Sequence, residues 1–205
     1  MEPSGLSDRN PALALFEFES ISAGIVAGDA MVKAAPLGSI HAGTVHPGRY
    51  LILVAGDTAS VEVAIDVGKD VGQAFVSDIV FLADAHPSVV DALRANKESA
   101  TAGDEALGIV ETRSVAAALD SADAGVKAAD VILAAIRLAD GLGGKGYVLF
   151  SGTVAEVEAG LDAAVARAEG HGALIRSDLI AQLHGEMADN LRGDLRFSKR
   201  VTGGR

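Results

Sequence analysis

The sequence predicts an α+β fold of two similar units in tandem, each a mainly antiparallel sheet with helices covering one face. The chain has 205 residues, which suffices for one large or two small domains. Residues 12–35 and 106–129 align without a gap and are identical at 11 of 24 positions. The similarity resumes in residues 48–65 and 144–161, where six positions are identical, so we interpret the chain as a tandem duplication.

The first half of each repeat shows a strand followed by a helix. Strands are predicted at 12–18 and 107–112, and the serine that follows each, Ser20 or Ser114, can cap the next helix by accepting a free backbone N–H. Pro36 ends the first of these helices, because the residue before a proline is disfavoured in helical geometry.

The second half of each repeat adds two strands joined by a glycine-containing tip, then a helix and a last strand. The helix follows Gly56 in the first repeat and Gly152 in the second, where residues 153–156 (TVAE) form a capping box. The last strands are predicted at 75–82 and 172–180. The order in both repeats is therefore strand, helix, strand, strand, helix, strand.

The repeat also sets the domain boundaries. The segment ANKESATAGDE between the copies is polar and rich in small residues, which is typical of a linker. The predicted organisation is a disordered N-terminal segment (1–11), a first domain (12–95), a linker (96–105), a second domain (106–192) and a flexible basic tail (193–205).

Composition excludes several classes of function. The net charge of −11 argues against nucleic acid and anionic membrane as partners. Cysteine is absent, which excludes disulfides, thiolate zinc sites and cysteine nucleophiles. The polar start MEPSGLSDRNP argues against a signal peptide, and the apolar runs are too short to span a bilayer. We therefore expect a soluble, intracellular protein.

The glycine-rich stretch DGLGGKGYVLF, residues 140–150, raises the possibility of a nucleotide-binding loop. Lys145 is followed by Gly146, however, so the hydroxyl of a Walker motif is missing. A strand-like segment follows the loop, and no helix N-terminus is predicted there to bind phosphate. The stretch GLGGK instead aligns with TVHPGR in the first repeat, so both are interpreted as tips between paired strands.

Several motifs together resemble the tandem-domain, trimeric shell proteins of bacterial microcompartments (BMC), and most closely the PduT-like branch. These motifs are SISAGIVAGDAMVKAA, TVHPGRYLILVAGD, LGIVETRSVAAALDSADAGVKAA and GLGGKGYVLFSGTVAEVE, within residues 12–192. The resemblance implies two ferredoxin-like BMC domains per chain and a pseudohexameric homotrimer with a central pore. It also implies a cytoplasmic protein that tiles with hexameric and pentameric shell proteins and lets small metabolites pass.

The resemblance further implies roles for particular residues. Lysines shared by both copies match a family lysine at the hexagon edge, where tiles meet, and two histidines lie near that edge. The implied edge contacts are Lys33, Lys127, His86 and His184. The implied pore-lining residues are Thr44, Val45, His46, Pro47 and Gly48 in the first tip, and Asp140, Gly141, Leu142, Gly143 and Gly144 in the second.

The sequence departs from the family pattern at two places. Where the PduT-like branch carries Cys-Pro-Gly at the pore and its three copies hold an iron–sulfur cluster, this chain has His46, so a cysteine-ligated cluster is impossible. Where many family domains carry Pro-Arg-Pro-His, this chain has DAHP, with His86, and AQLH, with His184. The arginine expected to lock the edges is therefore missing.

The three-fold symmetry of the implied trimer leaves two interpretations of His46. Three imidazoles around the axis could bind a metal ion and make the pore a metal or redox conduit. Alternatively, His46 is a polar lining residue that sets the width and charge of the pore. No cofactor other than this possible metal ion is predicted.

A third hypothesis is a trimeric α+β regulatory protein that binds a small ligand. An enzyme is not predicted, because no arrangement of nucleophile, base or metal ligands appears. Glu17 and Glu111 occupy equivalent positions in different domains, so a structural role is favoured over acid–base catalysis. His171 is isolated in the sequence and receives no role.

Overall fold

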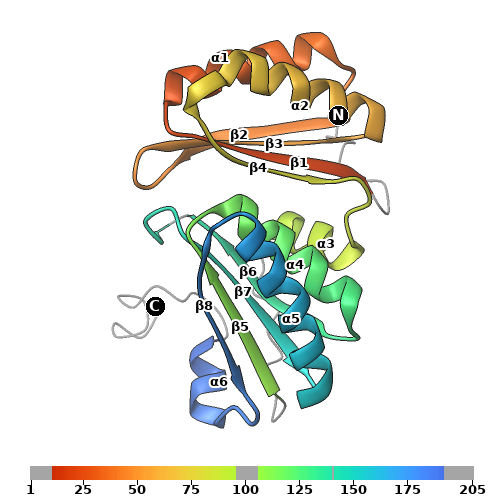
Figure 1. Cartoon of the computed structure of the whole chain (residues 1–205), viewed down its shortest axis with the longest axis vertical. Coiled ribbons are helices and arrows are strands. Elements are labelled where there is room, and N and C mark those ends of the chain that lie inside the picture. Colours follow the sequence, from red (N-terminus) through yellow and green to blue (C-terminus); the bar gives the residue numbers. More distant parts are fainter. Residues whose placement is uncertain (1–10, 96–105, 140, 192–205) are drawn as a thin grey trace.

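The computed structural model describes residues 11–95, 106–139 and 141–191. The first domain contains β1 (Ala12–Phe18), α1 (Ile21–Ala34), β2 (Ser39–Val45), β3 (Arg49–Gly56), α2 (Thr58–Gly72), a short 3-10 turn η2 (Gln73–Phe75), β4 (Val76–Leu82) and α3 (Pro87–Ala95). The second contains β5 (Ala106–Thr112), α4 (Val115–Ala128), β6 (Ile132–Leu138), β7 (Gly146–Gly152), α5 (Val154–Gly170), β8 (Leu174–Ile180) and α6 (Gly185–Leu191). Figure 1 shows the two domains one above the other along the long axis.

The two sheets confirm the predicted duplication and the α+β class. Their strand orders are β2-β3-β1-β4 and β6-β7-β5-β8, and the described strand pairs are antiparallel. Both central strands also carry the same irregularity, a shift in register beside Glu17 in β1 and beside Glu111 in β5. The repeat therefore extends from the sequence to the details of strand pairing.

Local signals start and stop the helices as the sequence predicts. The N–H of Ala23 donates to Ser20 Oγ at the start of α1, and the N–H of Ala117 donates to Ser114 Oγ at the start of α4. Helix α1 ends at Ala34, directly before the extended residue that precedes Pro36.

The capping box of α5 is also present. Glu156 N–H donates to Thr153 Oγ1, while the Glu156 carboxylate accepts from the Thr153 N–H.

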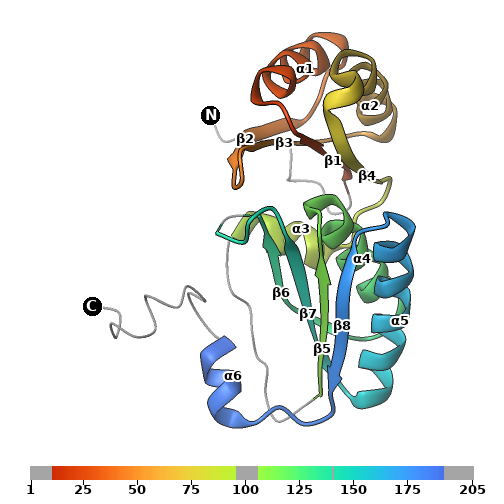
Figure 2. The ribbon, with the colours of Figure 1, turned by 60° about the vertical axis from the view of Figure 1, so that its left-hand side comes forward.

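Helices α1 and α2 cover one face of the first sheet, and α4 and α5 cover one face of the second (Figure 2). In the first domain this packing is close at Gly68 of α2, where an added Cβ would lie 2.9 Å from the Phe16 ring and 2.1 Å from Met31 Cε. The sequence analysis did not predict α3 or α6. Helix α6 lies on the opposite face of the second sheet, where Leu183 and Ala188 pack on Leu107.

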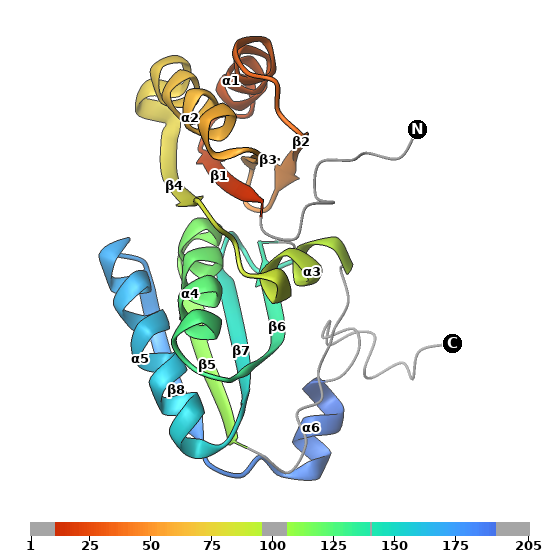
Figure 3. The same cartoon turned by 90° about the vertical axis from the view of Figure 1, so that its right-hand side faces the viewer.

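One of the apolar clusters spans both domains, beside a cluster that belongs to the first domain alone and a smaller one in the second. The face of the first sheet that α1 and α2 leave open packs against α4, through β1 and β4. Helix α3, assigned to the first domain by sequence, contacts α4 and β6 of the second (Figure 3). Leu13 and Val80 of the first domain thereby belong to the same buried cluster as Leu119 of the second.

Some sequence predictions lie outside the described residues. These are the N-terminal segment up to residue 10, the linker 96–105, Asp140 and the basic tail 193–205. Within the described part of the chain, no helix is both long enough and apolar enough to cross a bilayer.

Candidate functional site: two loop tips and the domain junction

The first predicted pore tip is the turn between β2 and β3. Thr44 and Val45 end β2, and His46, Pro47 and Gly48 are exposed in the turn. The His46–Pro47 peptide bond is cis, and Gly48 has a φ of 101°, a value that favours glycine.

The second predicted pore tip is the turn between β6 and β7. Gly141, Gly143 and Gly144 all have positive φ, and the turn is closed by backbone hydrogen bonds from Leu142 N–H to Ala139 O and from Lys145 N–H to Leu142 O. The glycines are thus required by backbone conformation, which supports the interpretation of this stretch as a strand-to-strand tip.

The structure brings the two tips together within one chain. A Cβ added at Gly144 would lie 3.1 Å from Pro47 Cδ and 3.4 Å from the carbonyl oxygen of His46. Gly144 is buried by this contact, whereas His46 stays exposed. The predicted lining residues of both copies therefore form a single surface, although they are almost 100 positions apart in the sequence.

A pair of charges lies at the base of each tip. Arg49, directly after the first tip, bonds through Nη1 to Glu17 Oε2 at 3.3 Å, and Lys145, after the second, bonds to Glu111 Oε1 at 2.8 Å. Glu111 is partly exposed, but Glu17 is fully buried. The equivalent glutamates thus anchor equivalent cations, as their structural interpretation expects.

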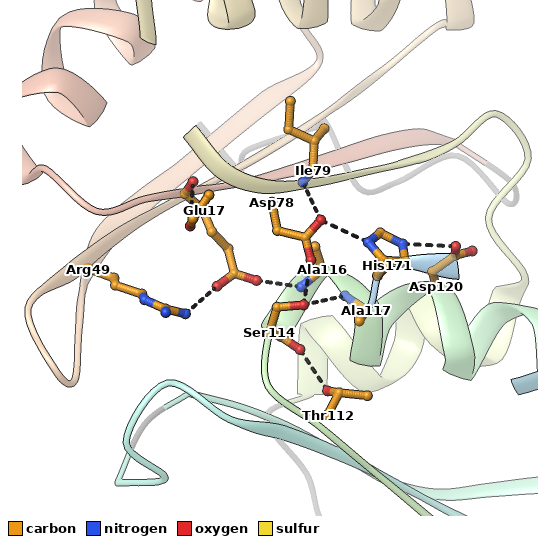
Figure 4. Close-up of polar contacts among 11 residues, drawn as sticks. Glu17, Arg49, Asp78, Ile79, Thr112, Ser114, Ala116, Ala117, Asp120 and His171 are labelled. Atoms are coloured by element: carbon orange, nitrogen blue, oxygen red, sulfur yellow. Dashed lines mark hydrogen bonds and ion pairs between the residues drawn. The ribbon is translucent and has the colours of Figure 1, made fainter. Parts of the chain in front are cut away.

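Glu17 also joins the two domains. Its Oε1 accepts the backbone N–H of Ala116, at the start of α4, at 2.7 Å (Figure 4). Burial is the main cause of a raised pKa for Glu17, opposed by this N–H and by Arg49. The carboxylate therefore fixes the first tip, through Arg49, to the first turn of a helix in the other domain.

His171 forms a further polar link between the domains, and the sequence did not predict it. Its Nδ1 lies 2.8 Å from Asp78 of β4, and its Nε2 lies 3.2 Å from Asp120 of α4 (Figure 4). Hydrogen bonds to Asp120 and Asp78 raise the pKa of His171 to about 9, so the ring is protonated at neutral pH. Asp78 also accepts the Ser114 hydroxyl at 2.5 Å.

The two lysines predicted at the tile edge, Lys33 and Lys127, have different surroundings. Lys33 is exposed on α1 and pairs with Asp29 one turn earlier, whereas Lys127 bonds to Asp123 and to the carbonyl oxygen of Asp84 in the first domain. Asp123 in turn accepts the backbone N–H of His86 at 2.7 Å. Lys127 therefore lies beside the domain junction, and its ammonium has partners within the chain.

His86 and His184 occupy matching positions directly before the helices α3 and α6. His86 Nδ1 accepts the backbone N–H of Ser88, and His184 Nδ1 accepts the backbone N–H of Glu186, both at 3.3 Å. Both rings thus cap helices that sequence reasoning did not predict. The next residue, Pro87 or Gly185, offered only a weak helix-start signal.

Within residues 11–95, 106–139 and 141–191, histidine, aspartate and glutamate side chains form no group of three that could hold a metal ion. A metal ion on His46 would therefore have to draw its ligands from several chains.

The comparisons with known proteins agree with one another. The BMC domain profile matches residues 12–84 and 106–183. The bacterial microcompartment shell protein PduT of Citrobacter freundii is 35% identical over 86% of this chain and 95% of its own length. The shell protein EutM of Escherichia coli K12 is 36% identical over 44% of this chain and 95% of its own length, so it corresponds to about one of the two repeats.

Solved structures support the fold. A microcompartment protein from Desulfitobacterium hafniense is 36% identical, with a TM-score of 0.74, over 87% of this chain and 98% of its own length. A fused, permuted hexameric shell protein of the RMM microcompartment shares the fold at 20% identity and a TM-score of 0.59, over 78% of this chain and 82% of its own. The chain therefore belongs to the BMC-domain family and carries two BMC domains in tandem.

Proposed function

We propose that this chain is a structural, non-enzymatic shell protein of a bacterial microcompartment, and that three copies close into a six-domain ring around a central pore. The shell role follows from family membership, since the named relatives are shell or microcompartment proteins. These relatives give no support to a regulatory ligand-binding protein. The ring is supported by the contact between the two domains of one chain, which is head-to-tail: the sheet side of the first domain packs on the helix side of the second. This contact leaves the helix side of the first domain and the sheet side of the second domain uncovered.

One uncovered side is the outer face of α1. Its counterpart α4 is almost wholly buried, because the first sheet packs on it. Leu119 of α4 is 0% exposed, whereas its counterpart Ile25 of α1 is 53% exposed. Two further pairs, Val115 with Ile21 and Val126 with Val32, show the same contrast between a buried and an exposed apolar residue.

The other uncovered side lies on the second domain. Val89 of α3 is 0% exposed against the second domain, whereas its counterpart in α6, Met187, is 53% exposed. Likewise Leu82 at the end of β4 is buried, and its counterpart Ile180 at the end of β8 is exposed. Apolar residues at these positions are accounted for if another copy covers them as the chain covers their counterparts.

These two surfaces are complementary. The outer face of α1 corresponds to the face of α4 that is covered inside the chain, and the β8–α6 side corresponds to the β4–α3 side that covers it. A second copy can therefore dock its α1 on the β8–α6 side of the first. A head-to-tail contact of this kind closes into a ring when its rotation fits a whole number of copies. A ring of three copies has six BMC domains.

The adjoining loop tips support the position of the pore. In such a ring, each chain contributes the paired tips around Pro47 and Gly144 to the axis. The exposed His46 side chains then line the opening together with Thr44 and the second tip. Lining width and polarity would select the small molecules that pass. Lys33 and Lys127, with the nearby His86 and His184, would meet neighbouring tiles, including other shell proteins, at the perimeter.

The ring can be tested by placing a charge on the exposed face of α1. Ile25→Glu should abolish the trimer, since a carboxylate would be buried without a partner in the contact between copies. Val63→Glu is the matched control: Val63 is an exposed valine of α2, and its counterpart Ala159 stays exposed although the domains are docked. Analytical ultracentrifugation should show a monomer for the first variant and a trimer for the second. A trimer for Ile25→Glu would refute this interface.

The same preparation decides between the two roles of His46. If the three imidazoles bind metal, the wild-type trimer should carry about one metal ion that His46→Ala lacks, by elemental analysis. Equal metal content in both proteins would leave His46 as a polar lining residue.

A further inference from the structure

Strand β4 forms one edge of the first sheet, and part of its backbone faces away from the sheet. The strand order β2-β3-β1-β4 gives β4 a single partner strand, β1. The N–H of Ile79 donates to the carboxylate of Asp78 at 2.8 Å, so this N–H points away from β1. Backbone direction repeats at every second residue of an antiparallel pair, so the N–H and C=O of Phe81 point the same way. These groups are available to a further strand.

The free edge of β4 borders a groove of about 450 Å³ beside α2. Three apolar and three charged residues line the groove, namely Ile65, Ile79, Phe81, Glu62, Asp66 and Lys69. Phe81 is 36% exposed although its side chain is large and apolar. Within the described part of the chain, the carboxylates of Glu62 and Asp66 have no side-chain partner. The groove therefore combines an apolar floor, an acidic rim and the unpaired backbone of a strand edge.

Contacts between domains leave this groove open. Helix α5 carries Glu158 and Asp162 at the places where α2 carries Glu62 and Asp66, and both stay exposed although the first domain packs on the second. By the same geometry, a second copy that docks on α1 leaves the acidic rim of α2 uncovered. The groove therefore lies outside the surfaces assigned to the ring.

The corresponding groove of the second domain has a less apolar floor. Phe16 of β1 pairs with Ile79, and its counterpart Val110 of β5 pairs with Ser177. A serine of β8 thus stands where β4 has an isoleucine. An apolar strand is therefore expected to prefer the edge of the first sheet over that of the second.

A segment with the matching sequence follows α6. Residues 195–202, LRFSKRVT, lie outside the described part of the chain, and in them Leu195, Phe197 and Val201 alternate with polar residues, as in a strand with one apolar face. Glycines flank the segment on both sides, at 193 and at 203–204. Residues 193–205 hold four cations against one acid, in a chain whose net charge is −11. A basic strand with an apolar face complements an apolar groove with an acidic rim.

We propose that residues 195–202 of another copy add to the free edge of β4 as a fifth strand of the first sheet. The face that carries Leu195, Phe197 and Val201 covers the apolar floor of the groove, and Lys199 on the same face meets the acidic rim. Backbone hydrogen bonds to a sheet edge supply affinity, and alternate side chains in the groove supply specificity. The tail thus links one copy of the shell protein to another, by a contact that is separate from the ring.

The segment must come from another copy because of where α6 ends. Helix α6 ends at Leu191 and lies on the face of the second sheet opposite α4 and α5 (Figure 2). The four residue steps from Leu191 to Leu195 span at most about 14 Å. This length is too short to carry the strand around the second sheet to the first domain of the same chain.

Disulfide trapping tests the strand pairing, because the chain has no cysteine of its own. Full-length Phe81→Cys and Phe197→Cys, refolded together and oxidised, should give a mixed dimer as the main linked product, identified by peptide mass. In the matched control Ser198→Cys replaces Phe197→Cys, so the thiol lies on the opposite face of the added strand, and most of the mixed dimer should be lost. Equal linking of the two tail thiols, or no linking by either, would overturn the inference.

Tryptophan fluorescence gives an independent measurement, because the chain has no tryptophan. In full-length Phe197→Trp, the emission should be blue-shifted relative to the urea-unfolded protein, and the shift should be lost on dilution. Adding Glu62→Lys with Asp66→Lys should raise the midpoint of this dilution curve about tenfold, since two charges of the rim are reversed. Adding Glu158→Lys with Asp162→Lys instead makes the same change on α5 and should leave the midpoint unchanged.

The outcomes separate this contact from the ring. A fully exposed tryptophan at high protein concentration, or a control on α5 that weakens the contact as much as the change on α2, would overturn the inference even if Phe81→Cys failed to fold. Neither result affects the ring, whose contacts do not include the groove. A wild-type protein that never reaches trimer mass, but whose cysteine variants still form the mixed dimer, would overturn the ring and support the strand.

Discussion

Replacing His171 by glutamine should remove a pH-dependent part of the stability that holds the two domains together. The ring donates to Asp78 of the first domain and to Asp120 of the second, and its side chain is only 14% exposed. Residue 171 has an ordinary right-handed helical backbone, with φ of −78° and ψ of −8°, so glutamine fits there without strain. Uncharged glutamine cannot bridge two carboxylates as an imidazolium does.

The magnitude follows from the pKa of His171, which rises from 6.5 to about 9 on folding. A shift of this size corresponds to at most about 3 kcal/mol. Because the folded-state pKa is raised, this contribution is fully present below pH 6.5 and is lost as the pH rises to 9. The wild type should therefore lose unfolding free energy across this window, and the His171→Gln variant should lack that loss.

Urea unfolding followed by circular dichroism, at pH values from 6 to 9.5 and one protein concentration, measures the difference. The stability advantage of the wild type over His171→Gln should shrink steadily as the pH rises. His41→Gln, which changes an exposed histidine of β2, is the control and should follow the wild-type profile. Parallel profiles for wild type and His171→Gln would refute the assignment of His171 as a charged link between the domains.

Three further predictions follow from the described contacts. Gly144→Ala should cost about 1–2 kcal/mol by thermal unfolding, since φ is +86° and the new Cβ meets the other tip, whereas Gly43→Ala, with open space around it, should be nearly neutral; equal losses would contradict the tip contact. Thr153→Ala should lower the free energy of unfolding by about 1 kcal/mol, because the capping box is lost, and Thr153→Ser should restore most of it. Equal stability of the alanine variant and the wild type in thermal unfolding would contradict the cap. Replacing Lys33 and Lys127 together by alanine should stop sheet formation in electron micrographs while the trimer persists, and unchanged sheets would refute the edge assignment.

The fold was predictable because the duplicated residues are those that build the elements. Ser20 and Ser114 start equivalent helices, and Gly56 and Gly152 precede the next ones, so each copy corroborates the other. Helices α3 and α6 escaped prediction because their sequences share little beyond one histidine before each.

The loop tips were also predictable, because the glycines that mark the second tip in the sequence are the residues whose positive φ the turn requires. The link through His171 was not, because its partners Asp78 and Asp120 lie 93 and 51 positions away and neither repeats in the other copy. Polar links between domains join residues that lie far apart in the sequence and follow no local pattern. Only the packed domains show that His171 has two carboxylate partners.

The central claim, a closed ring of three two-domain chains, is tested most directly by native mass spectrometry of the wild-type protein. The account predicts one dominant species at three times the chain mass of 20.7 kDa. That species should persist on moderate dilution, because apolar faces on α1 and on the β8–α6 side are buried at every junction. A stable monomer or dimer would contradict the ring, and with it the pore formed by the paired loop tips.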